Sequence, residues 1–129
     1  MSETRKKTVL IVEDNDKNMK LARDILEAKG YMALTATSGQ EGVEVAIARI
    51  PDLILMDIQL PDFDGVEAYR QLRADPRTAA IPVAAFTASV TAGDRSRVTQ
   101  AGFTAFVSKP INLQEFIATI ARLTKEPPS

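Results

Sequence analysis

Leu53-Ile54-Leu55-Met56-Asp57 decides the fold, because four consecutive apolar residues are followed at once by an acid. A strand that is apolar on both of its faces is covered on both sides, which is typical of the middle of a parallel sheet. A second run, Val9-Leu10-Ile11-Val12, stops in the same way at Glu13-Asp14. The two runs therefore predict two buried strands that each end in carboxylates.

Helix and strand patterns alternate between these two runs. Apolar residues at helical spacing extend from Met19 to Leu26, and Gly30 closes that helix. Residues 31–36 then read as a strand. Ser38-Gly39-Gln40-Glu41 has the S-x-x-E form of a capping box, which predicts the start of a helix that ends before Pro51.

The same alternation continues after Asp57. The expected elements are helices over about residues 65–74 and 93–101 and strands over residues 83–87 and 105–108. A last helix is predicted after Asn112, its N-cap, with Glu115 three residues on. Its apolar face consists of Leu113, Phe116, Ile117, Ile120 and Leu123.

Five strands alternating with five helices predict an α/β protein with a doubly wound, five-stranded parallel sheet between two layers of helices. We expect the strand order 2-1-3-4-5, with the first strand between the second and the third. In such sheets, functional residues gather at the carboxyl ends of the strands, near the point where the strand order reverses.

The composition limits the kinds of catalytic site, metal site and partner that the chain can have. The chain has 129 residues, which suits one domain, and it lacks cysteine, histidine and tryptophan. Thiol nucleophiles, zinc sites of the Cys/His kind and imidazole catalysis are therefore excluded. With 16 Lys and Arg against 17 Asp and Glu, the net charge of −1 predicts neither nucleic acid nor an anionic membrane as a partner.

The two ends of the chain are polar. Residues 1–7 lack the apolar region of a signal peptide, and no apolar stretch approaches the ~20 residues of a spanning helix, so we expect a cytoplasmic protein. We expect residues 1–7 to be a polar extension, residues 8–125 the domain and residues 126–129 a tail. Met1 and this tail favour a complete chain over one excised from a larger protein, and both interpretations stay open.

Five residues at the predicted strand ends share one edge of the sheet, namely Glu13, Asp14, Asp57, Thr87 and Lys109. Two carboxylates ~4 Å apart repel by about 4 kcal/mol at an effective dielectric constant of 20, so a cation is needed among them. Oxygen ligands without imidazole or thiolate favour Mg²⁺ or Mn²⁺, and an ammonium suits phosphate oxygens. Together these groups predict a site for phosphoryl transfer onto a carboxylate.

Each residue also has a simpler interpretation. Taken singly, an Asp at a strand end is more often a turn former or a helix cap, and Thr is a common strand residue. Lys109 alone suits a solvated charge, and Phe106 suits a core position. Only the combination at one sheet edge favours a site.

The sequence resembles the receiver domains of two-component response regulators over about residues 8–125. The resemblance rests on ordered motifs, namely Val9-Leu10-Ile11-Val12-Glu13-Asp14-Asn15, Asp52-Leu53-Ile54-Leu55-Met56-Asp57-Ile58-Gln59-Leu60-Pro61, Asp64-Gly65, Phe86-Thr87-Ala88 and Ser108-Lys109-Pro110. The strings around Asp14 and Asp57 are also similar to those of stand-alone cell-division regulators of the DivK type. This family implies a flavodoxin-like, CheY-like three-layer sandwich.

The resemblance implies a phosphoacceptor and a metal site. Asp57 is then the phosphorylated residue, and Asp14, Asp57 and the backbone carbonyl of Gln59 bind Mg²⁺ or Mn²⁺ directly. Glu13 acts through a coordinated water, and Lys109 holds a phosphoryl oxygen. Such a protein is not an enzyme in the usual sense, because it catalyses only its own phosphorylation and dephosphorylation.

The resemblance also implies a switch. Thr87 would turn toward the phosphoryl group, its neighbour Ala88 would offer a backbone N–H, and Phe106 would turn inward as the aromatic member. Phe106 lacks the hydroxyl that many relatives carry at this position. The Lys109-Pro110 pair matches a family position with a cis peptide bond.

The implied partners are proteins. A sensor histidine kinase or a histidine phosphotransfer protein would supply the phosphoryl group by docking on the first helix and around Pro110. A downstream target of unknown identity would bind the face of the fourth helix, fifth strand and fifth helix. The chain itself would be a monomer or a weak dimer.

Three alternatives share parts of this pattern. A flavin- or nucleotide-binding module needs a phosphate cradle after the first strand, where Glu13-Asp14-Asn15-Asp16 would repel phosphate. A dehalogenase-like phosphatase needs a second acid two residues after the nucleophile, where Gln59 stands. A receiver that binds partners without phosphorylation is disfavoured by the complete acid, Thr and Lys set.

Overall fold

The computed structural model describes residues 7–58, 65–87 and 92–124, with strands and helices alternating throughout. The strands are β1 (Thr8–Val12), β2 (Met32–Ala36), β3 (Leu53–Met56), β4 (Val83–Thr87) and β5 (Ala105–Ser108). The helices are α1 (Asp16–Ala28), α2 (Gly39–Arg49), α3 (Gly65–Ala74), α4 (Ala92–Ala101) and α5 (Leu113–Thr124). The tail 126–129 and most of the expected extension lie outside the described residues, so the expected domain limits stay a prediction.

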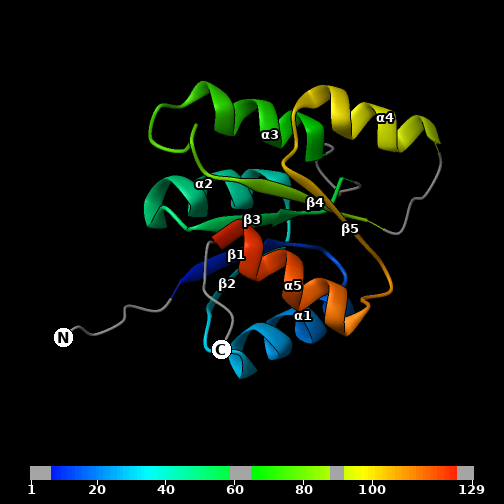
Figure 1. Ribbon diagram of the computed structural model, residues 1–129. Helices are drawn as coiled ribbons and strands as arrows, with labels where there is room; N and C mark the ends of the chain where they lie inside the picture. Colours follow the sequence, from blue (N-terminus) through cyan, green and yellow to red (C-terminus); the bar gives the residue numbers. More distant parts are fainter. Residues whose placement is uncertain (1–6, 59–64, 88–91, 125–129) are drawn as a thin grey trace.

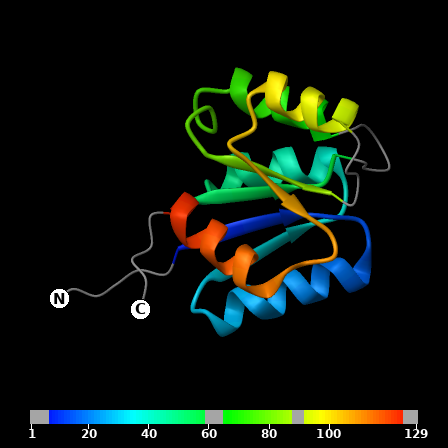
Figure 2. The same ribbon diagram turned by 45° about the vertical axis from the view of Figure 1, so that its right-hand side comes forward.

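The five strands form one parallel sheet in the order β2-β1-β3-β4-β5. Figures 1 and 2 show α1 and α5 on one face of this sheet and α2, α3 and α4 on the other. The predicted fold class and strand order are therefore confirmed. Among the described residues, no helix is both long and apolar enough to cross a membrane.

Two buried clusters separate the layers. β3 is buried at all four positions, and its side chains alternate between the two clusters, so that Leu53 and Leu55 face α1 and α5 while Ile54 and Met56 face the other helices. β1 is divided in the same way, with Val9 and Ile11 on the α1 and α5 side. This two-sided burial explains why both runs are apolar at successive positions.

Local capping fixes the starts of α2 and α5 as predicted. The Ser38 hydroxyl accepts from the Glu41 N–H at 3.1 Å, and the Asn112 side chain accepts from the Glu115 N–H at 3.0 Å. The Glu41 carboxylate reaches back to the N–H of Thr37 at 2.8 Å. These bonds satisfy backbone donors that a helix start leaves without partners.

The turn after α1 explains why β2 begins at Met32 rather than at Tyr31. Gly30 has a φ of +90°, and its N–H donates to the carbonyl of Glu27. The N–H of Tyr31 donates to the carbonyl of Leu26, and both side chains are buried in one cluster. This pair of bonds is a Schellman motif, which requires glycine at the left-handed position. Because the backbone N–H of Tyr31 is used to close α1, β2 starts one residue later.

The segment after α3 carries an acid whose ionisation is tied to folding. The Asp75 carboxylate accepts from the backbone N–H of Arg77 at 2.8 Å and from its guanidinium at 3.0 and 2.7 Å. The guanidinium and then the N–H lower the pKa of Asp75 to about 2. Because the folded-state pKa lies below the unfolded value, this contribution to stability is present above the unfolded pKa and is lost as the pH falls toward 2.

We therefore expect Asp75→Asn to lower the free energy of unfolding at pH 6 and to have a smaller effect at pH 3. At pH 3 the wild-type carboxylate has begun to lose its contribution to stability. Urea unfolding of both proteins at the two pH values measures this. An equal loss at pH 3 and pH 6 would contradict the assignment.

Candidate functional site

The carboxyl ends of β1 and β3 bring three acids together. The N–H of Asp57 donates to the carbonyl of Val12 at 3.0 Å, and the N–H of Glu13 donates to the carbonyl of Ala36 at 2.9 Å. These backbone bonds continue the ladder one residue past the strands and fix where the acidic side chains start. One carboxylate oxygen from each of Glu13, Asp14 and Asp57 lies within 4.8 Å of the others.

The three acids differ in their exposure to solvent. Glu13 is 1% exposed and Asp57 5%, whereas Asp14 is exposed. Burial raises the pKa of the Glu13 carboxyl above its usual range, and the negative charge of Asp57 adds to this increase. The ammonium of Lys109 and the N–H of Asn15, which donates to Oε2 of Glu13 at 3.0 Å, act in the opposite direction. The cluster thus has a buried floor and a rim open to solvent.

Lys109 is the cation of this cluster. Its Nζ donates to Oδ2 of Asp57 at 3.2 Å and forms an ion pair with Oε1 of Glu13, and its side chain is only 10% exposed. The backbone N–H of Lys109 donates to the carbonyl of Thr87 at 2.9 Å, and the bond between Lys109 and Pro110 is cis. The ammonium therefore lies between two carboxylates that come from different strands.

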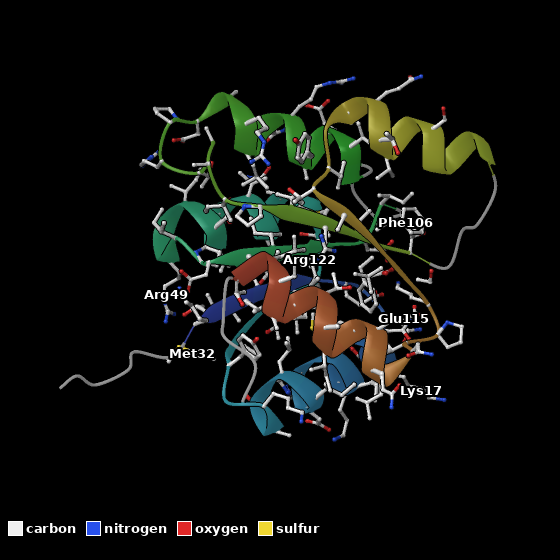
Figure 3. All side chains as sticks on the ribbon, viewed as in Figure 1. Lys17, Met32, Arg49, Phe106, Glu115 and Arg122 are labelled. Carbon is white, nitrogen blue, oxygen red and sulfur yellow. The ribbon has the colours of Figure 1, made fainter. Side chains whose placement is uncertain are left out.

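Thr87 and Phe106 lie on the two strands beyond β3. Thr87 is fully buried at the end of β4, opposite Ser108 of β5. Phe106 pairs with Ala85, is half-buried and packs against the cluster under α2, α3 and α4. Figure 3 shows Phe106 on the same side of the molecule as Lys17 and Glu115, which lie in the first turns of α1 and α5 near the carboxyl ends of the strands.

The structure thus brings Glu13, Asp14, Asp57 and Lys109 into direct proximity and places Thr87 one strand away from Asp57. The predictions for Gln59 and Ala88 concern residues that lie outside the described residues.

The donor set fits a small divalent cation. Three carboxylates against one ammonium leave excess negative charge, and the repulsion is largest for the two buried acids. Hard oxygen donors of this kind suit Mg²⁺ or Mn²⁺. Exposed Asp14 at the rim gives an ion access from solvent.

Two further residues shape the site without having been assigned a role from the sequence. A Cβ at Gly65 would lie 2.4 Å from the carbonyl oxygen of Asp57 and 2.8 Å from Cα of Ile58, so α3 starts directly against the chain that follows the acid. The ring of Phe86 lies beneath Nζ of Lys109, 4.8 Å from the ring centroid. Gly65 stands at the start of a predicted helix. A glycine at such a position is a signal for close backbone approach, because it has no Cβ. The Phe86 contact has no local sequence signal.

Comparison with known proteins agrees with this geometry. The profile of the response regulator receiver domain matches residues 9–121. The polar-differentiation response regulator DivK of Brucella ovis is 49% identical over 114 residues, covering 88% of this chain and 93% of the relative. DivK of Brucella anthropi is 48% identical over the same shares. The resemblance to DivK-type regulators is confirmed.

Solved structures show the same fold. The receiver domain of a sensor histidine kinase from Pseudomonas aeruginosa, solved with a magnesium ion in its active-site cleft, has a TM-score of 0.87 and 32% identity and covers 95% of this chain and 100% of its own. A response regulator structure from Chloroflexus aurantiacus has a TM-score of 0.89 and 26% identity over 95% of this chain and all of its own. The chain belongs to the response regulator receiver domain family of two-component signalling proteins.

Proposed function

We propose that the protein accepts a phosphoryl group on Asp57 and passes a signal on through phosphorylation-dependent contacts with other proteins. The observation that carries the proposal is the position of the Asp57 carboxylate. It stands at the carboxyl end of β3, is hydrogen bonded to Nζ of Lys109 at 3.2 Å and lies within reach of two further acids. In the transfer, a carboxylate oxygen of Asp57 forms the new bond to phosphorus as the bond from phosphorus to the donor breaks.

The residues around Asp57 have distinct parts in this proposal. Asp14 and Asp57, with the carbonyl of Gln59, would hold Mg²⁺ directly, and Glu13 would act through a water. When bound, the ion neutralises charge on the phosphoryl oxygens. Lys109 supplies a second positive charge from a nearly buried position, where the charge is less screened by water than at the surface.

We propose the family's switch for the signal that follows. Thr87 would follow the phosphoryl group with its hydroxyl, the N–H of Ala88 would donate to it, and Phe106 would change its packing on β5. The backbone N–H of Lys109 donates to the carbonyl of Thr87 at 2.9 Å. A shift at the end of β4 would therefore be passed to the end of β5.

The 129 residues contain no histidine, so a phosphohistidine that feeds Asp57 would not lie among them. We propose a histidine kinase or a phosphotransfer protein that docks on α1 and around Pro110, where Leu21 and Leu113 are 47% and 54% exposed.

A downstream protein would bind the side of β5 and α5, where a hollow is lined by Phe106, Val107, Ser108, Pro110, Asn112, Glu115, Phe116 and Thr119. By similarity to DivK, that pathway would control cell polarity or division. A cytoplasmic location and a monomer or weak dimer complete the proposal.

Labelling with a small phosphoryl donor tests the proposal. After incubation with acetyl phosphate and Mg²⁺, intact-mass measurement is expected to find one phosphoryl adduct on the wild type and none on Asp57→Asn. Asp75→Asn, which removes an acid outside the site, is the matched control and should be labelled like the wild type. The loss of the adduct over time measures self-catalysed dephosphorylation.

A wild type that takes up no label, or an Asp57→Asn variant that is still labelled, would refute the assignment of Asp57. The first outcome would favour a receiver that binds its partners without phosphorylation.

A further inference from the structure

Phe86 gives the ammonium of Lys109 a third neighbour besides the two carboxylates. Nζ of Lys109 lies 4.8 Å from the centroid of the Phe86 ring. Phe86 is fully buried and immediately precedes Thr87 on β4, so the ring forms part of the floor on which the lysine side chain rests.

The ring is held in place from two directions. The backbone of Phe86 is paired with Val107 of the neighbouring strand β5. Its ring also packs on the ring of Phe116 from α5, with centroids 6.4 Å apart and planes inclined by 41°. Because Val107 and Phe116 are themselves buried, the Phe86 ring has little freedom to move away from the ammonium.

The face of an aromatic ring attracts a cation through its quadrupole, and the attraction grows as water is removed from the pair. Here Phe86 is fully buried and the Lys109 side chain is 10% exposed, so the pair lies largely out of water. An aliphatic side chain would fill the same space without this attraction.

The ring contact differs from the two ion pairs because its strength does not depend on the charge of a neighbouring carboxylate. The pairs of Lys109 with Glu13 and Asp57 depend on the charges of those carboxylates, and the charge at Asp57 changes when it is modified. The attraction to the Phe86 ring does not depend on either acid. A change of charge at Asp57 therefore does not by itself remove this attraction.

We propose that Phe86 is a positioning residue that holds the Lys109 ammonium at the phosphoryl-accepting carboxylate through a cation–π contact. This inference rests on the proposed phosphoryl transfer to Asp57. It makes Phe86 a determinant of the transfer rate although its side chain touches neither the donor nor the metal in the proposed reaction.

Graded fluorination of the ring separates the quadrupole from packing. Replacing Phe86 with 4-fluorophenylalanine and then with 3,4,5-trifluorophenylalanine changes the shape of the ring little and weakens the negative potential of its face in steps. We expect the rate of acetyl phosphate labelling to fall in the same steps, by about fivefold for the trifluoro ring. Phe86→Leu should lower the labelling rate by at least as much.

A second measurement does not depend on labelling. Without Mg²⁺, the same fluorinated rings should lower the free energy of unfolding stepwise in the wild-type background and should have no graded effect when combined with Lys109→Met. Phe103→Leu is the packing control, because Phe103 stacks on Tyr69 at 4.4 Å on the other side of the sheet. It should lower stability and leave the labelling rate near that of the wild type.

The outcomes are distinct. Equal labelling rates across the fluorinated series, with the wild type labelled normally on Asp57, would overturn the role of Phe86 and leave the proposed function standing. A wild type without any label would overturn the proposed function itself. A stepwise loss of both rate and Mg²⁺-free stability, absent with Lys109→Met, supports the inference, and the fluorinated series tests it even if the Lys109→Met protein does not fold.

Discussion

Addition of Mg²⁺ to the metal-free protein is expected to raise its melting temperature by roughly 10 °C at saturating concentrations. Glu13, Asp14 and Asp57 place carboxylate oxygens within 4.8 Å of one another, and two of the three acids are buried. A cation that binds only the folded state adds RT ln(1+[L]/Kd), which is about 2.7 kcal/mol at one hundred times Kd. For a chain of this length, each kcal/mol corresponds to roughly 3–5 °C.

Salt matching makes this test specific. The melting curve with MgCl2 is compared with one at equal ionic strength in KCl, because screening alone weakens repulsion between charges. Asp14→Asn should lose most of the Mg²⁺ response while melting near the wild type without the ion, since Asp14 is exposed. Asp75→Asn should keep the full response. Equal melting temperatures in the two salts would contradict a divalent site.

Gly65→Ala is expected to disrupt the site from the side of α3. The added Cβ would lie 2.4 Å from the carbonyl oxygen of Asp57, 2.8 Å from Cα of Ile58 and 3.0 Å from the side chain of Met56. The two closest atoms belong to the backbone, so no flexible side chain can move aside. We expect a loss of about 2–3 kcal/mol in the free energy of unfolding, at the upper end for an overpacked position.

The same substitution should slow labelling of Asp57 more than tenfold, since displacement of the chain after Asp57 moves its carboxylate relative to Lys109. Gly30→Ala is the matched control. It has no atom within 4 Å of the added Cβ but has a φ of +90°, so it should lower stability by about 1–2 kcal/mol and leave labelling unchanged. Gly65→Ala with wild-type labelling and stability would show that the close approach to Asp57 is unimportant.

The helices and strands could be predicted because their signals are local. The apolar run of β3, the capping residues Ser38 and Asn112 and the left-handed Gly30 each act through neighbours a few residues away. The start of β2 was the exception by one residue, because the backbone of Tyr31 is used to close α1. Even α4, with little apolar surface, forms as predicted, and Val98 anchors it in the core.

The acidic site could be predicted because parallel strands end at one edge. Once Val12 and Met56 are paired in neighbouring strands, the acids that follow them must meet. The contact of Asp57 with Lys109 spans 52 positions of sequence and follows from the order β1-β3-β4-β5 together with the length of the lysine side chain.

The sequence by itself determined the order of elements, the parallel sheet and the set of groups at its carboxyl edge, because periodicity, caps and strand ends are local properties. Only the tertiary structure decided that Glu13 is buried enough to raise its pKa, that Gly65 touches the backbone of Asp57 and that the Phe86 ring supports Lys109. Burial and contact of this kind depend on how residues distant in sequence pack against each other. No local pattern records that packing.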